Sequence, residues 1–575
     1  MDILDPAFRY LAIRLSWYAG RAIALFLKQN AEGGGLKGNT PEERYQFFEQ
    51  ELAKGIDTIG WFLEQFPVLA RILCTCTVNW VEASVEMLHR FQSDRDDLID
   101  TFFGGGDPGD IRQVYSGLSD AHQGGRTVAI LEFMSGDRVV YKPRSAAIDL
   151  AYEKVVTWIN TQSGIKELAF SKALDRVDYG WYQFTAAKPC GSPEDVRDYF
   201  ERQGQFLALQ YLLCGSDYHS GNFIGQGAFP VPIDMEAMCA AGLHVVKELV
   251  GTVPASMIPT VFSVLKLGML PMFRVGSPDR LLEFSSALTG QGSSGLAGVR
   301  PIWKNRGTDR LSLSFERPEK AIVEEGSLPV LEGSPVPVYD YEAEVLCGFQ
   351  NMHRLIIQKR EEFLSEEGPL SLLRTSKTRS LIRNTQDYND VLYWGTSPEH
   401  LSSGAAFEVS LERLWLSNFK ESRPKAVFEA EREALLNGDI PAFYSETTSK
   451  SLFGKGKNLP LFPNSALDQV HLRVSMADES DRRWQSSLIE KSIGFARAFD
   501  RREPPESRGD SPFLDAARRI ADTLVNLAIR DDAGSRWLDL KKVSSTNDSL
   551  MYQVSDPFLH SGNGGIALFL ANIAS

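Results

Sequence analysis

Apolar residues in the first hundred positions recur at intervals of three and four. The pattern is clearest in residues 47–73 and 78–103. This spacing places the apolar side chains on one face of a helix. Residues 1–100 are therefore predicted to form a helical region. Gly104–Gly106, followed by Pro108, marks its end.

The pattern becomes strand-like after this break. Residues 126–145 predict a β-hairpin with Ser135–Asp137 at its turn. Residues 147–161 predict a helix, residues 181–190 a strand, and residues 196–214 an amphipathic helix. This order is typical of a small sheet lobe on a helical lobe. The sequence therefore predicts an α+β fold with a bilobal core.

The second half of the chain alternates between loop-rich and helical segments. Residues 290–345 are rich in Gly, Pro and Ser and are expected to form loops or a partly mobile segment. Helices are predicted at 341–364 and 515–530, and residues 501–512 are interpreted as a linker. We find no internal repeat.

Composition narrows the class of protein. The chain has 575 residues and a formal net charge of -14, which argues against a general nucleic-acid binder. Six scattered Cys residues are typical of reduced thiols, and Cys74 and Cys76 have no second pair at zinc spacing. The N-terminus lacks the pattern of a signal peptide, and no uninterrupted apolar stretch is long enough to span a bilayer. We therefore expect a soluble, cytoplasmic protein without stable membrane insertion.

Residues 216–238 gather polar side chains of the kind used in phosphoryl transfer. They include Asp217, His219, Asn222, Asp234 and Glu236 among apolar neighbours. Asp217 and Asn222 are five residues apart, the spacing of the catalytic Asp and the metal-binding Asn in protein kinases. Asp234 follows the apolar stretch FPVPI, as the magnesium-binding Asp of kinases follows a short hairpin. Lys142 ends the second strand of the predicted hairpin, where kinases carry a phosphate-pairing Lys.

Each of these residues also has a plain structural explanation. Lys142 could be a solvated cation, Asp217 a polar turn residue, and His219 a structural hydrogen-bonding group. Their joint occurrence in this order favours a site in which Asp217 accepts or orients a hydroxyl proton and Lys142 neutralises phosphate charge. Magnesium ligands would come from Asn222, Asp234 and Glu236. Neither GxGxxG nor GxxxxGK[ST] occurs, which argues against a P-loop fold.

Six stretches together resemble one known family. They are SDAHQGGRTVAILEF, VVYKPRS, SDYHSGNFI, PVPIDME, SVLKLGMLP and SGNGGIALFLA. They resemble the dehydratase domain of class II lanthipeptide synthetases, the LanM family, over nearly the whole chain. The resemblance implies a lipid-kinase-like fold with added helical elements at both ends. It also implies that ATP and Mg²⁺ are used to phosphorylate Ser and Thr of a ribosomal precursor peptide. Phosphate is then eliminated to give dehydroalanine or dehydrobutyrine.

The resemblance further implies which residues act. For phosphorylation they are Lys142, Asp217, His219, Asn222, Asp234 and Glu236. For elimination they are Asp120, His122, Arg379 and Thr385. If SLIR is a strand, Arg379 and Arg383 share one face, and Thr385 begins a helix whose N–H groups suit a phosphate. Alternatively, Thr385 only caps the helix and the arginines pair with carboxylates.

The resemblance also divides the chain into parts. These are an N-terminal helical region at 1–100, a kinase-like dehydratase core at 101–400, a helical C-terminal part at 401–545, and a stub at 546–575 that resembles the start of a LanC-like cyclase. We expect no cyclase activity and no zinc in this chain. The expected partner is a precursor peptide with a leader segment, and a cyclase acting in trans is a further candidate partner. A plain kinase and a non-catalytic remnant of a truncated synthetase are the other interpretations.

Overall fold

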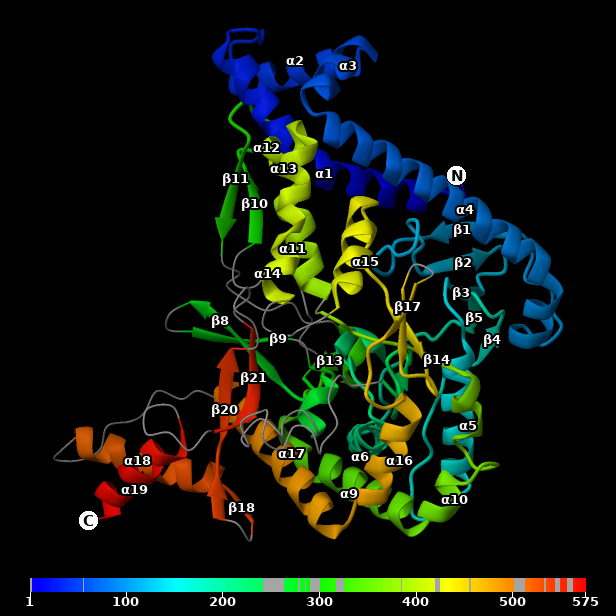
Figure 1. Ribbon diagram of the computed structural model, residues 1–575, viewed down its shortest axis with the longest axis vertical. Coiled ribbons are helices and arrows are strands. Elements are labelled where there is room, and N and C mark those ends of the chain that lie inside the picture. Colours follow the sequence, from blue (N-terminus) through cyan, green and yellow to red (C-terminus); the bar gives the residue numbers. More distant parts are fainter. Residues whose placement is uncertain are drawn as a thin grey trace.

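The computed structural model of the chain combines helices with small antiparallel sheets (Figure 1). It describes residues 3–54, 56–240, 263–277, 280–284, 286–289, 300–316, 325–383, 385–418, 424–454, 457–500, 512–531, 534–542, 549–555 and 562–574. The predicted α+β class is confirmed, whereas the kinase-like bilobal arrangement stays a prediction. Of the predicted linker at 501–512, residues 501–511 lie outside the described residues.

Four helices form the N-terminal region, as predicted. They are α1 (Asp5–Glu32), α2 (Pro41–Ala53), α3 (Ile56–Gln65) and α4 (Pro67–Phe102). The start of α2 shows why the sequence breaks there: the Thr40 hydroxyl accepts a hydrogen bond from the Glu43 N–H, and Pro41 opens the first turn. The region does not bury its apolar faces by itself. Its core cluster also contains residues between 388 and 440.

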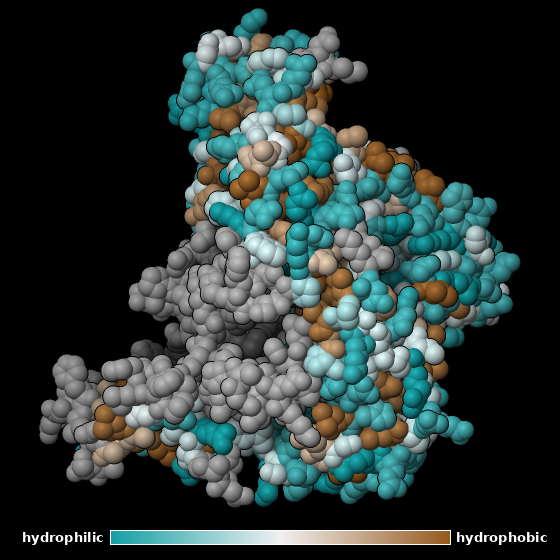
Figure 2. All heavy atoms as spheres, in the orientation of Figure 1, coloured by the Kyte–Doolittle hydropathy of each residue, from teal (hydrophilic) through white to brown (hydrophobic). Residues whose placement is uncertain are grey.

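Helix α4 differs from the sequence prediction in one respect. Among the described residues it is the one helix whose length and composition would allow it to cross a membrane. Figure 2 shows apolar residues along the edge of the molecule where α4 runs. However, Leu69, Ile72 and Cys76 of α4 are buried in the N-terminal core. A core helix of a globular protein has the same composition, so this observation assigns no membrane location.

A five-stranded antiparallel sheet follows α4. Its order is β1 (Ile111–Tyr115), β2 (Ala129–Phe133), β3 (Arg138–Lys142), β5 (Gly180–Gln183) and β4 (Ala173–Asp175). The predicted β2–β3 hairpin and its turn are confirmed. Helix α5 (Ala147–Asn160) buries the predicted stripe that includes Ile148 and Val155. The strand predicted at 181–190 ends earlier, at Gln183.

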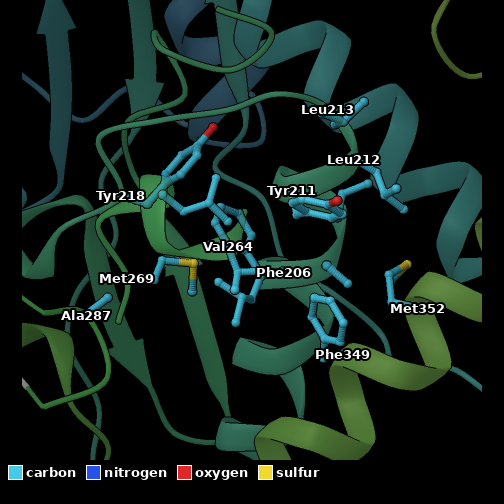
Figure 3. Packing of buried hydrophobic residues seen from close by; sticks show 14 of the residues in the cluster. Phe206, Tyr211, Leu212, Leu213, Tyr218, Val264, Met269, Ala287, Phe349 and Met352 are labelled. Carbon is cyan, nitrogen blue, oxygen red and sulfur yellow. The ribbon is translucent and has the colours of Figure 1, made fainter. Parts of the chain in front are cut away.

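Helix α6 (Pro193–Leu212) leads from the sheet to the polar segment at 216–238. The predicted amphipathic pattern is confirmed only in its first part, where Glu194 and Arg197 are exposed and Val196 is buried. It is wrong for the second part, because all residues from Arg202 to Leu212 are buried, including the glutamines. Helix α9 (Glu342–Gln358) packs along one side of it, and Phe206 contacts Tyr218 on another, with ring centroids 5.1 Å apart. Figure 3 shows this packing, with Phe349 and Met352 approaching from α9. The rigid core therefore holds the start of the polar segment in place.

Two glycines allow α6 and α9 to approach closely. A Cβ atom at Gly204 would overlap the carbonyl oxygen of Val345, and one at Gly348 would overlap that of Glu201. We expect Gly204→Ala to lower the free energy of unfolding by about 3 kcal/mol, because backbone atoms cannot move aside. Gly494→Ala in α17 is the matched control, since a Cβ there contacts nothing within 4 Å. In this control the free energy of unfolding should rise by about 0.5–1 kcal/mol. Urea unfolding curves of both variants check this, and equal midpoints would contradict it.

Residues 290–345 were expected to form loops, and this is wrong for two short hairpins. They are β10 (Arg300–Lys304) with β11 (Ser312–Glu316), and β12 (Val330–Leu331) with β13 (Ser334–Pro335). Residues 290–299 and 317–324 lie outside the described part. The helices predicted at 341–364 are confirmed as α9 and α10 (Arg360–Leu364).

The C-terminal half contains both helices and short strands. The helices are α11 (Thr385–Gly395), α12 (Pro398–Ser402), α13 (Gly404–Leu411), α14 (Arg413–Asn418), α15 (Lys425–Leu436), α16 (Ala466–Met476), α17 (Glu479–Asp500), α18 (Pro512–Leu527) and α19 (Asn563–Ala574). One sheet contains β14 (Lys377–Arg379), β15 (Tyr444–Glu446), β16 (Ser451–Gly454) and β17 (Lys457–Pro460). The region expected to be helical, 401–545, therefore also contains strands.

Strands near the C-terminal end of the chain pair with strands from the middle of the sequence (Figure 1). The sheet order is β20 (Leu538–Lys542), β21 (Ser549–Val554), β8 (Met272–Ser277) and β9 (Arg280–Phe284), and a separate hairpin joins β18 (Ile529–Asp531) to β19 (Gly534–Arg536). The boundary expected between 545 and 546 thus falls between two paired strands. Residues on both sides of it belong to one sheet.

Candidate functional site

A cavity of about 1130 Å³ lies beside the five-stranded sheet, the polar segment after α6, β14 and the start of α11. It is lined by all ten residues selected from the sequence: Asp120, His122, Lys142, Asp217, His219, Asn222, Asp234, Glu236, Arg379 and Thr385. The fold therefore brings together the residues expected to add phosphate and those expected to remove it.

The loop after α6 has an unusual backbone at Asp217, with φ of +64°. Asp and Asn adopt this left-handed conformation more readily than most residues. The Asn222 side chain donates to the Asp217 carbonyl at 2.5 Å and holds the turn. His219 Nδ1 accepts from the Gly221 N–H at 3.1 Å, so a neutral His219 ring carries its proton on Nε2. Burial raises the pKa of the Asp217 carboxyl, although His219 and Arg379 act in the opposite direction.

The hairpin of β6 (Phe223–Gln226) and β7 (Phe229–Pro232) brings Asp234 back to Asn222. The Ile233 N–H donates to the Asn222 carbonyl at 2.9 Å. Strand β7 ends at Pro232, and residues 236–239 form a turn, so Glu236 does not continue a strand from Asp234. Asp234 Oδ1 accepts from the Glu236 N–H at 3.2 Å and stabilises that turn. Glu236 still faces the cavity, but from a different backbone conformation.

Two cations from β3 and the residues after it face Asp234. Lys142 Nζ lies 3.9 Å from Asp234 Oδ1 and donates to the Ile233 carbonyl, and burial lowers the pKa of Lys142. Arg144, which the sequence analysis missed, bonds Asp149 at 2.7 Å and Asp234 at 2.8 Å. Burial alone would raise the pKa of Asp234, but Lys142 and Arg144 hold it below its ordinary value. Asp234 is therefore an anion fixed between two cations.

Arg379 connects the two predicted sets of residues. Its guanidinium forms an ion pair with Glu236, and its backbone N–H donates to the Glu236 carbonyl at 2.7 Å. Thr378 Oγ1 donates to the same carbonyl at 3.1 Å. The end of β14 is thus fixed to the turn that follows Asp234.

Arg383 does not share this face. The strand ends at Arg379, and Arg383 instead forms a two-pronged ion pair with buried Glu431, at 2.7 and 3.1 Å. Residues 380–383 are therefore not a strand, and the condition under which Arg379 and Arg383 would share one face is not met. Both arginines pair with carboxylates, as the alternative interpretation proposed. Thr385 begins α11, as predicted, with Gln386 and Asn389 also on the cavity wall.

Asp120 and His122 come from a loop that is held by Asp439. The Asp439 carboxylate accepts from the Gly124 N–H at 2.6 Å and from the Gly125 N–H at 2.9 Å. His122 Nδ1 donates to the Ile440 carbonyl at 2.7 Å, which leaves Nε2 free of a proton in the neutral ring. Burial, assisted by the charge of Arg379, lowers the pKa of His122. The ring is therefore neutral at physiological pH and can accept a proton.

Comparison with known proteins places the chain in a family. DUF4135, described as a domain of unknown function, matches residues 66–446. The chain belongs to this family. It is also similar to the lacticin 481/lactococcin biosynthesis protein LcnDR2 of Lactococcus lactis subsp. lactis, with 26% identity over 593 residues. The alignment covers 96% of this chain and 60% of that protein. Both findings support membership in the LanM family, which the sequence motifs indicated.

A magnesium ion bound with phosphates would suit part of this DUF4135 site. Mg²⁺ needs only one or two protein carboxylates when phosphates and water complete its shell. Asn222 and Asp234 both line the cavity, and the backbone hydrogen bond from the Ile233 N–H to the Asn222 carbonyl keeps their two segments together. The contacts of the Asp234 carboxylate with Lys142, Arg144 and the Glu236 N–H all use Oδ1. Glu236 fits less well, because its oxygens already contact Arg379 and, at 3.5 Å, Arg144. In the described part of the chain, no three His, Cys, Asp or Glu side chains are close enough to form a metal site by themselves.

Two further residues of the DUF4135 cavity were missed. Arg144 could have been found, because it stands two residues after Lys142 in the stretch KPRS. Tyr444 on β15 could not, because no motif surrounds it. It is the direct cross-strand partner of Arg379. Such pairings become visible only in the folded chain.

Proposed function

We propose that the chain is a lanthipeptide dehydratase that uses ATP and Mg²⁺. It would phosphorylate Ser and Thr of a ribosomal precursor peptide and then eliminate the phosphate to form dehydroalanine and dehydrobutyrine. One observation carries the proposal: the residues expected for both steps line a single cavity, and the Arg379–Glu236 ion pair joins them. A phosphopeptide formed there would not need to leave before elimination.

The phosphorylation step is supported by the distribution of charge and apolar surface. Ile130 and Val140, paired across β2 and β3, line the cavity and offer apolar surface suited to a purine ring, and Lys142 follows two residues after Val140 on the same strand. Magnesium held by Asn222 and Asp234 would neutralise phosphate charge. The Asp217 carboxylate, a stronger base because burial raises its pKa, would take the hydroxyl proton of the acceptor. The acceptor oxygen then forms a bond to the γ-phosphorus of ATP, while the bond between this phosphorus and the oxygen that leaves with ADP breaks.

The elimination step needs a base and an anion site. A base removes the Cα proton, the electron pair forms the Cα=Cβ bond, and the Cβ–O bond breaks to release phosphate. His122 offers an unprotonated Nε2, with Asp120 beside it in the same loop. Arg379 and the N-terminus of α11 at Thr385 offer positive charge and donors to the phosphate.

Mass spectrometry of a precursor peptide tests the proposal. The purified chain is incubated with ATP, Mg²⁺ and a peptide that carries a leader segment and Ser or Thr residues. A loss of about 18 Da at each modified residue is expected from the chemistry of elimination. Phosphopeptide that accumulates without this loss would indicate a plain kinase. Absence of ATP turnover in folded protein would favour the non-catalytic remnant.

The pH dependence of elimination tests His122. The neutral ring is the active form, so a lowered pKa keeps the base available at lower pH. The rate from a supplied phosphopeptide should therefore hold from about pH 8 to below about pH 6.5, the ordinary value for His, and fall only beneath it. Phosphate release measured across this range checks the expectation. His89→Gln, at an exposed His of α4, should leave the pH dependence of the elimination rate unchanged. His122→Gln should remove the fall of this rate at low pH. A rate that already falls above pH 6.5 would contradict it.

A further inference from the structure

Tyr444 stands next to Arg379 on the cavity wall. Strands β14 and β15 are antiparallel neighbours, and Arg379 and Tyr444 are directly opposite in their register. Opposed residues project their side chains to the same face of a sheet. Both residues line the cavity. The phenol and the guanidinium therefore face the same space from adjacent strands.

The Tyr444 hydroxyl has no hydrogen-bond partner among the residues that the structure describes. The other tyrosines of the cavity wall differ from it. Tyr182 donates to Asp149 at 2.8 Å, and the Tyr393 hydroxyl is fully enclosed. A phenol that is partly accessible in a polar cavity is a donor available to a ligand.

The charges around Tyr444 keep it in the donor form. Burial, together with the Glu236 carboxylate, raises the pKa of Tyr444 to about 12. The phenol therefore keeps its proton at neutral pH and adds no negative charge. Arg379 alone should bind an anion more weakly than a free guanidinium would, because Glu236 already pairs with it. A second, neutral donor beside it would strengthen the hold on phosphate.

We propose that Tyr444 donates a hydrogen bond to the phosphate group as it leaves the peptide. With Arg379 and Thr385 it would form one anion site on the elimination side of the cavity. The proposal rests on the dehydratase function proposed above. When the Cβ–O bond breaks, its electron pair moves to the bridging oxygen, and a donor aimed at that phosphate stabilises the growing charge. Tyr444 would act on the leaving group, while a separate base takes the Cα proton.

Tyr444→Phe tests the proposal, because it removes one oxygen and keeps the ring. We expect the rate of elimination from a supplied phosphopeptide to fall about tenfold to a hundredfold, as for loss of a hydrogen bond to a charged group. Phosphorylation should stay unchanged, so phosphopeptide accumulates from a precursor peptide and ATP. Tyr393→Phe is the matched control, because it removes a hydroxyl of the same cavity wall that has no hydrogen-bond partner in the described part of the chain. It should eliminate at the parental rate.

Binding of inorganic phosphate provides a measurement that does not depend on turnover. Isothermal titration should show that Tyr444→Phe weakens phosphate binding about tenfold, while Tyr393→Phe leaves it unchanged. The proposal is overturned if Tyr444→Phe eliminates phosphate and binds phosphate at the parental levels. It is also overturned if Tyr444→Phe slows phosphorylation and elimination equally and lowers the unfolding midpoint. If the parent binds phosphate through Tyr444 but converts no peptide, the dehydratase function fails and the anion site stands.

Discussion

Asp217→Asn is expected to lower the rate of phosphoryl transfer to the peptide by about a thousandfold, because the amide cannot accept the hydroxyl proton. Asn suits the left-handed backbone at this position, so the loop that carries Asn222 should keep its shape. Ala would add strain of about 1–2 kcal/mol there and confuse the result. The measurement is the initial rate of phosphopeptide formation at saturating ATP.

The same variant should eliminate phosphate from a supplied phosphopeptide at nearly the parental rate. Asp96→Asn, at an exposed carboxylate of α4, is the control for the loss of one negative charge. Phosphopeptide formation at the parental rate would exclude Asp217 as the proton acceptor. Loss of both steps together would show that the loop serves the whole cavity rather than phosphorylation alone.

Arg379→Met is expected to lower the rate of elimination by about a hundredfold to a thousandfold, because it removes a preorganised cation from the leaving phosphate. Phosphopeptide should accumulate from a precursor peptide and ATP, which mass spectrometry detects directly. Thr385→Val should act in the same direction, and Thr385→Ser, which keeps the hydroxyl, is its control. If Arg379→Met and Asp217→Asn gave the same product pattern, the proposed division of labour would be wrong.

The ion pair adds a second expectation for Arg379→Met. Removing the guanidinium leaves the Glu236 carboxylate with Arg144, at 3.5 Å, as its remaining cation contact. A largely buried carboxylate that has lost its closer cation disturbs its neighbours, so phosphorylation should also slow, though much less than elimination. The double variant with Glu236→Gln removes this charge and should recover part of the phosphorylation rate. No recovery would mean that Glu236 is itself needed as an anion.

Local patterns predicted the elements around the site because their causes are local. The β2–β3 hairpin follows from two short apolar runs on either side of a Ser-Gly-Asp turn, and α5 from a stripe of apolar residues at helical spacing. The helical start at Thr385 was predicted for the same reason. Predictions that depended on distant neighbours were less successful. Helix α6 carries glutamines, yet its residues from Arg202 to Leu212 are buried. Tyr218 donates to Gln210 Oε1 at 2.6 Å, while Gln210 Nε2 has no partner among the residues that the structure describes.

The sequence by itself determined the α+β class and ten of the residues that line the cavity, together with the order in which they occur. It could do so because motif residues keep fixed spacings along the chain. Only the tertiary structure decided how their charges are shared. Glu236 pairs with Arg379 across 143 positions, Arg383 turns away to Glu431, and Tyr444 becomes the neighbour of Arg379 through strand pairing. Ion pairs and strand register depend on distances in space, and spacing along the chain does not encode those distances.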